Sequence, residues 1–99
     1  MAITIVRGSI GQLQGPFSQG DSIRFGAGVK LGFAIGEKDF MKAGDPNTNN
    51  GFAFKIDDQL IRMGRTYLYE TDDSTKVTSV SFPQGAPASL IIDYVIAES

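Results

Sequence analysis

The sequence contains no cysteine and no histidine. Without cysteine, the chain has no disulfide framework, no thiol nucleophile and no thiolate ligand for a metal ion. Without histidine, it has no imidazole general base, no Ser-His-Asp triad and no imidazole metal ligand. Zinc sites are excluded in practice, because they are built mainly from these two residue types. Any catalysis would have to use carboxylates, lysine, tyrosine or a metal ion that prefers oxygen ligands.

Long apolar runs and a strong net charge are also absent. No run of about eighteen apolar residues occurs, so the sequence predicts no membrane-spanning helix. Residues 1–7 lack the basic region, apolar core and cleavage site of a secretory signal, so we expect no export. Nine basic and eleven acidic residues give a net charge of −2, which argues against a nucleic-acid partner. We therefore expect neither nucleic acid nor a membrane among the partners.

The composition that remains is that of one folded domain. Of the 99 residues, 41% are hydrophobic and 10% are aromatic, which is enough to build a core. No linker or internal repeat divides the chain, so we expect a single domain over residues 1–99.

Residues 22–36 alternate between apolar side chains and polar or very small ones. The apolar side chains occupy every odd position: Ile23, Phe25, Ala27, Val29, Leu31, Phe33 and Ile35. A period of two predicts β-strand and not helix. At about 3.3 Å per residue the stretch would span about 43 Å, whereas a domain of this size has a radius of gyration of about 13 Å. We therefore expect it to bend at the Gly26-Ala27-Gly28 triplet into two segments that bury one continuous face.

The opposite face of this stretch carries Gly26, Gly28 and Gly32. Because these residues have no side chain, a second layer or another chain could approach closely there. The three glycines are therefore candidate interface residues.

Residues 89–97 are apolar on both faces. One face consists of Leu90, Ile92, Tyr94 and Ile96. The other face carries Ile91 and Val95, with Asp93 between them. Such a strand is either central in a two-layer core or pressed against another subunit. Ile91, Asp93 and Val95 therefore complete the predicted interface.

The rest of the chain predicts further short strands separated by turns. We expect strands at residues 2–7, 52–56, 60–63, 65–71 and 76–82, and one helical turn at 37–42. Residues 8–20, which contain several glycines, are expected to be irregular, with Ile10, Leu13 and Phe17 as apolar anchors. Because no long amphipathic helix is present, the predicted fold is all-β: a small antiparallel β-sandwich or barrel with a glycine-kinked long strand.

No cofactor or metal motif is complete. The sequence 26–32 resembles a dinucleotide-binding loop, but Leu31 stands where the third glycine is needed, and both flanks are predicted strands. The polar loop 44–51 offers Asp45, Asn47, Asn49 and Asn50 as oxygen ligands for calcium. The EF-hand spacing fails there because Ile56 replaces the required glutamate. We expect solvated turns, no metal and no cofactor.

Carboxylates are the remaining catalytic candidates, but the sequence cannot pair them across a cleft. Asp93 lies within an apolar strand, so we expect it to be the one partly buried acid, with Arg24, Arg62 or Arg65 as its partner. This arrangement is structural, and we expect no enzymatic activity.

Tyr67 and Tyr69 lie on the same face of a predicted strand. Facing inward they would be core residues, and the polar neighbours of Leu68 favour this orientation. Facing outward they could stack on a sugar, with Asp45, Asn47, Asn49 and Asn50 hydrogen-bonding to it. A carbohydrate- or ligand-binding β module is therefore the alternative function.

The order of the segments resembles that of small β-rich virion proteins of tailed bacteriophages, such as tail, baseplate or capsid-decoration subunits. The resemblance rests on the opening strand at Ile3 to Val6, the glycine- and glutamine-rich residues 8–20, and the run from Phe82 to Pro87 before the last strand. It implies a non-enzymatic structural protein of a virion that associates with itself and with other structural proteins. Outside a virion, the lack of an export signal predicts a cytoplasmic location.

Overall fold

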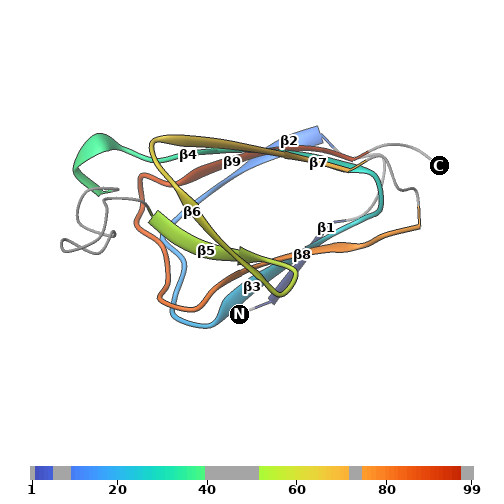
Figure 1. Cartoon of the computed structure of the whole chain (residues 1–99), viewed down its shortest axis with the longest axis horizontal. Helices are drawn as coiled ribbons and strands as arrows, with labels where there is room; N and C mark the ends of the chain where they lie inside the picture. The colour runs from blue at the N-terminus through green and yellow to red at the C-terminus, as the bar shows by residue number, and fades with distance from the viewer. Residues whose placement is uncertain (1, 6–9, 40–51, 72–74, 97–99) are drawn as a thin grey trace.

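The computed structural model describes residues 2–5, 10–39, 52–71 and 75–96 (Figure 1). Within these ranges the chain forms two β-sheets that face each other across a common core. Sheet A contains, in spatial order, β1 (Ala2–Ile5), β3 (Asp21–Phe25), β8 (Thr78–Phe82), β5 (Phe52–Ile56) and β6 (Gln59–Met63). Sheet B contains β2 (Ile10–Gln14), β9 (Ile91–Ile96), β4 (Val29–Ala34) and β7 (Thr66–Glu70).

The predicted all-β fold is confirmed as a small, mainly antiparallel sandwich. The strands expected at 52–56, 60–63, 65–71, 76–82 and 89–97 are all present, with ends displaced by two residues at most. One pairing departs from the prediction, because β1 and β3 run parallel. The chain passes through β2 in sheet B between these two strands, which supplies the crossover that parallel neighbours require.

The predicted long strand is two strands that belong to different sheets. β3 ends at Phe25 in sheet A, β4 begins at Val29 in sheet B, and Gly28 between them has a φ of 72°. Only glycine adopts this backbone conformation without strain. Odd-numbered side chains stay buried on both sides of the connection, so the continuous inner face is confirmed.

The core lies between the sheets and is rich in aromatic rings. Phe54 lies at its centre, with ring centroids 4.6 Å from Phe33, 5.8 Å from Phe52 and 6.4 Å from Phe82. Phe82 in turn stacks on Phe17 at 4.6 Å. The aliphatic side chains that are fully buried around these rings are Ile23, Val29, Val80, Leu90 and Ile92.

The prediction for residues 8–20 was wrong, because residues 10–14 form β2 and pair with β9. A Cβ at Gly11 would lie 2.5 Å from the Tyr94 hydroxyl oxygen, so the Tyr94 side chain occupies the space beside this glycine, and the glycine does not break the strand. Phe17 is a core residue as expected, and Leu13 packs against the core. Ile10 is not an anchor, since 79% of it is exposed.

Residues 37–39 are helical and begin the turn predicted at 37–42. No helix in the described ranges is long and apolar enough to cross a membrane.

Candidate functional site

The surface of sheet B that faces away from the core is the first candidate site. Strand alternation places on this outer face the side chains of Ile10, Gln12, Gln14, Lys30, Ala34, Thr66, Leu68, Glu70, Ile91, Asp93 and Val95, together with Gly32. Three large apolar residues on it are open to solvent: Leu68 is 82% exposed, Ile10 79% and Val95 44%. Ile10 and Val95 are direct cross-strand partners, so they form one continuous apolar area.

The outer face of sheet A carries polar and charged side chains at its centre. Its central positions are Ser22, Arg24, Ser79, Ser81 and Lys55, and the register places Ser81 between Ser22 and Lys55. Its large exposed apolar residues in the described ranges lie away from these positions: Leu60 on the edge strand β6, and Val77 directly before β8. The centre of this face is therefore polar, in contrast to that of sheet B.

A shallow depression of about 260 Å³ lies on the outer face of sheet B. Its lining includes Gly32, Leu68, Asp93 and Val95. Leu68 lies beside Gly32, since a Cβ at Gly32 would be 3.6 Å from the Leu68 Cδ2. Because Gly32 has no side chain, it leaves the depression open between Leu68 of β7 and Asp93 of β9.

The predicted interface residues are only partly brought together. Ile91, Asp93, Val95 and Gly32 share the outer face of sheet B. Gly26 and Gly28 lie instead in the connection between the sheets, where Gly26 donates its N–H to the carbonyl of Ile5 at 3.0 Å and Gly28 is buried.

The prediction for Asp93 was wrong, because its side chain is exposed. It accepts a hydrogen bond from the Gln12 Nε2 at 2.9 Å and not from an arginine. The apolar strand around Asp93 suggested burial, but the face that Asp93 shares with Ile91 and Val95 is the outer face of sheet B.

The second candidate site is a groove of about 610 Å³ between the edge strands of the two sheets. β6 runs obliquely from the edge of sheet A toward sheet B, where the chain continues into β7 (Figure 1). The groove is lined by Ile56, Asp57, Asp58, Gln59, Ile61, Tyr67, Tyr69 and Lys76.

The two tyrosines face the core side of sheet B, as the inward alternative predicts. Both are half-buried and pack against the core. The Tyr67 ring lies 6.2 Å from both Phe33 and Phe54, edge-on to the latter. Each ring therefore has one part in the core and another at the groove. Asp45, Asn47, Asn49 and Asn50, predicted to join them, lie outside the described residues.

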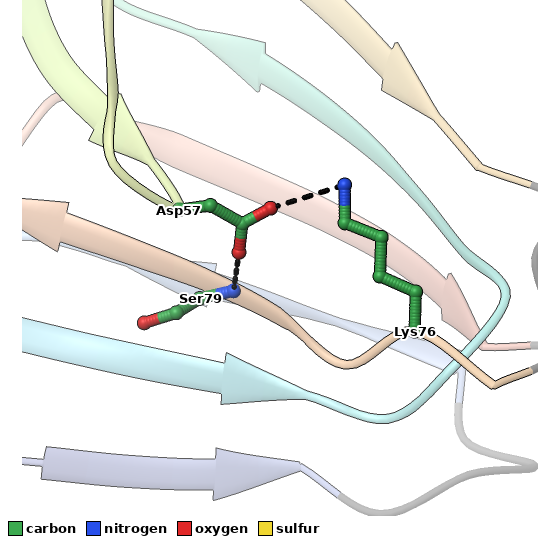
Figure 2. A network of polar contacts seen from close by, with 3 residues as sticks. All are labelled: Asp57, Lys76 and Ser79. Atoms are coloured by element: carbon green, nitrogen blue, oxygen red, sulfur yellow. Dashed lines mark hydrogen bonds and ion pairs between the residues drawn. The ribbon is translucent and has the colours of Figure 1, made fainter.

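At one end of the groove, Asp57 contacts both Ser79 and Lys76 (Figure 2). Its backbone φ is 54°, unusual for a residue with a side chain. Its N–H donates to the Ser79 carbonyl at 2.6 Å, and its Oδ1 accepts from the Ser79 N–H at 3.0 Å. The carboxylate therefore accepts the hydrogen bond that a backbone carbonyl of β5 would accept if the strand continued.

The second carboxylate oxygen of Asp57 lies 3.3 Å from the Lys76 Nζ. The hydrogen bond to Asp57 raises the pKa of Lys76 above 10.5, and the nearby Tyr69 phenol adds to the increase. Any stabilisation from this ion pair is present at neutral pH and is lost as the pH rises through the raised pKa. Sequence alone did not reveal this network, because its members come from separate turns and strands.

Asp57→Ala should lower the free energy of unfolding by about 2 kcal/mol, because it leaves the half-buried Ser79 N–H without its acceptor and places alanine at a positive φ. Asp57→Asn retains the side-chain oxygen and tolerates this backbone, so we expect a loss below about 1 kcal/mol. Urea unfolding followed by circular dichroism measures both. Equal losses for the two variants would show that the ion pair, and not the backbone contact, is what matters.

No group of three or more acidic side chains that could hold a metal ion occurs in the described ranges. Comparison of the chain with protein-family models, with curated proteins and with solved structures found no match.

Proposed function

We propose that this chain is a non-enzymatic structural subunit that associates with further copies of itself through the outer face of sheet B. The observation that carries the proposal is the exposure of Leu68, Ile10 and Val95 on one sheet face. Exposed apolar area of this kind is typical of interaction surfaces, and the contrasting polar face of sheet A shows that the fold does not require it.

A second copy is the occupant that fits this face best. The face carries charges of both signs, Lys30 against Asp93 and Glu70, so two copies can present opposite charges to each other. Sheet B also ends on both sides in strands, β2 and β7, that have one neighbour each in the described part of the chain. Symmetric association is a common way to cover such edges.

A virion is the setting we propose for this association. The order of the segments resembles that of small virion proteins of tailed bacteriophages, in which the chain would contact other structural proteins as well as its own copies. The apolar outer face of sheet B is the surface through which such subunits would join.

Val95→Asp should weaken self-association by roughly tenfold or more, because a carboxylate would be buried between copies. In the free subunit the new carboxylate is exposed beside Lys30, so the stability should change by less than about 0.5 kcal/mol. Ser81→Asp, which adds the same charge to the outer face of sheet A, is the matched control. Light scattering measures the association, and urea unfolding measures the stability. A Val95→Asp variant that loses stability but associates like the native chain would contradict the proposal.

A ligand-binding module is the alternative, supported by the groove at Tyr67 and Tyr69. Two aromatic rings beside carboxylate, amide and ammonium groups resemble a site for a sugar. The chain has no tryptophan, and two of its three tyrosines, Tyr67 and Tyr69, line the groove, so tyrosine emission responds to a ligand bound there. Titration with oligosaccharides should change that emission in the native protein and not in Tyr69→Ala. No change in the native protein would eliminate this alternative.

A further inference from the structure

The strand β7 forms one edge of sheet B, and its pairing with β4 determines which backbone groups face outward. The Ile35 N–H donates to the Arg65 carbonyl at 3.0 Å, and the Thr71 N–H donates to the Val29 carbonyl at 3.1 Å. In an antiparallel pair, residues alternate between those bonded to the partner strand and those whose backbone groups point away from it. Odd-numbered residues of β7, including Tyr67 and Tyr69, therefore bond to β4.

The even-numbered residues Thr66, Leu68 and Glu70 consequently direct their N–H and C=O groups away from β4. Sheet B ends at β7 in the described part of the chain, so no strand of the same chain pairs with them. The edge contains neither proline nor lysine, two residues that commonly prevent edge pairing. Its sequence is Thr-Tyr-Leu-Tyr-Glu, rich in residues that favour strands.

This edge is complementary to itself. When a second β7 is placed antiparallel with Leu68 on the two-fold axis, Leu68 lies opposite Leu68, and Thr66 lies opposite Glu70. All of these positions have outward backbone groups, so each N–H meets a carbonyl. If the register were shifted by one residue, odd-numbered residues of one β7, whose backbone groups already bond to β4, would lie opposite even-numbered residues of the other. The hydrogen bonds between the two β7 strands could then not form.

The side chains agree with the same register. On the outer face the two Leu68 side chains, each 82% exposed in the single chain, become neighbours and bury each other. On the inner face Tyr67 of each copy lies opposite Tyr69 of the other. The two Glu70 carboxylates fall at opposite ends of the pairing, so they do not repel each other.

We propose that β7 pairs antiparallel with β7 of a second copy about a two-fold axis at Leu68, joining the two B sheets into one continuous sheet. This inference rests on the proposed self-association and specifies how the first two copies meet. The apolar outer faces then lie side by side on one surface, on which further copies can pack.

The native chain contains no cysteine, so single cysteines can test the register. Directly opposite residues in a bonded antiparallel pair have Cα atoms about 5.5 Å apart, within the range of a disulfide. Leu68→Cys should therefore oxidise to a disulfide dimer roughly ten times faster than Leu60→Cys, because pairing raises the effective thiol concentration. Leu60→Cys is the matched control, since Leu60 is 53% exposed and lies on β6, the edge strand of sheet A, outside the proposed interface.

A second pair of variants tests the same register without altering Leu68. Thr66→Cys and Glu70→Cys should each oxidise slowly alone but rapidly to the mixed dimer when combined. The readout is non-reducing electrophoresis of the full chain, with circular dichroism confirming that each variant is folded.

The two proposals fail in different ways. If the native chain associates but Leu68→Cys oxidises no faster than Leu60→Cys and the mixture shows no preference, the β7 pairing is overturned and self-association stands. If the native chain remains a monomer and no variant oxidises preferentially, both proposals are overturned.

Discussion

Phe82→Ala should lower the free energy of unfolding by about 3–5 kcal/mol. Phe82 is completely buried, and its ring stacks on Phe17 at 4.6 Å and lies 6.4 Å from Phe54. It therefore joins the segment that follows β2 to the aromatic centre of the core. The alanine variant loses the transfer free energy of the ring and leaves a cavity that these neighbours cannot fill without moving.

The loss is a large share of the roughly 5–15 kcal/mol that stabilises a typical domain. Urea unfolding followed by circular dichroism measures it, with Phe82→Leu as the control that keeps most of the volume. We expect the leucine variant to lose less than half as much. A loss below about 1 kcal/mol for Phe82→Ala would contradict the assignment of this ring to the core.

Gly15→Ala should lower the free energy of unfolding by about 3 kcal/mol. A Cβ at this position would lie 2.1 Å from the Pro87 carbonyl oxygen, a backbone atom that cannot rotate away. The same contact region includes the bond from the Gly15 N–H to the Leu90 carbonyl, at 2.9 Å. The added methyl group would push apart the segments that precede β3 and β9.

Gly64→Ala is the matched control, because a Cβ there meets no atom within 4 Å. We expect it to be neutral or to stabilise the fold by up to about 1 kcal/mol, through the lower entropy of the unfolded chain. Thermal unfolding of both variants distinguishes the two positions. Similar effects at Gly15 and Gly64 would contradict the close packing described for residue 15.

The sheets could be predicted wherever side chains alternate strictly. In β4 and β5 every second residue is large and apolar, and the structure buries those residues. β3 and β8 follow the same alternation, except that the first buried position of each is polar, Asp21 and Thr78. The alternation survives the turn at Gly28, because the chain changes sheets there without changing which side chains face the core. The local sequence therefore predicted which side chains of these strands face the core, but not which sheet each strand would join.

β2 was missed because its sequence, Ile-Gly-Gln-Leu-Gln, places one of its two large apolar residues, Ile10, on the solvent side. The Tyr94 side chain that lies beside Gly11 belongs to a strand at the other end of the chain. The burial expected for Asp93 was inferred from the apolar strand around it, but the face that it shares with Ile91 and Val95 is open to solvent. Which side of a strand meets the core is decided by the other strands of the fold, and the local sequence did not specify it here.

The candidate site was predicted in part. Ile91 and Val95 were identified correctly as a second apolar face, because β9 has more apolar residues than one face can use. Ile10 and Leu68 join that face only through the order of strands in sheet B, which sequence does not specify. The face as a whole is therefore a product of the fold.

Sedimentation equilibrium of the native chain, from micromolar to millimolar concentration, tests the central claim most directly. If the outer face and the β7 edge of sheet B join copies of the chain, the average mass should rise with concentration from the 10.6 kDa of one chain to at least twice that value. A mass that stays at 10.6 kDa over the whole range would contradict self-association.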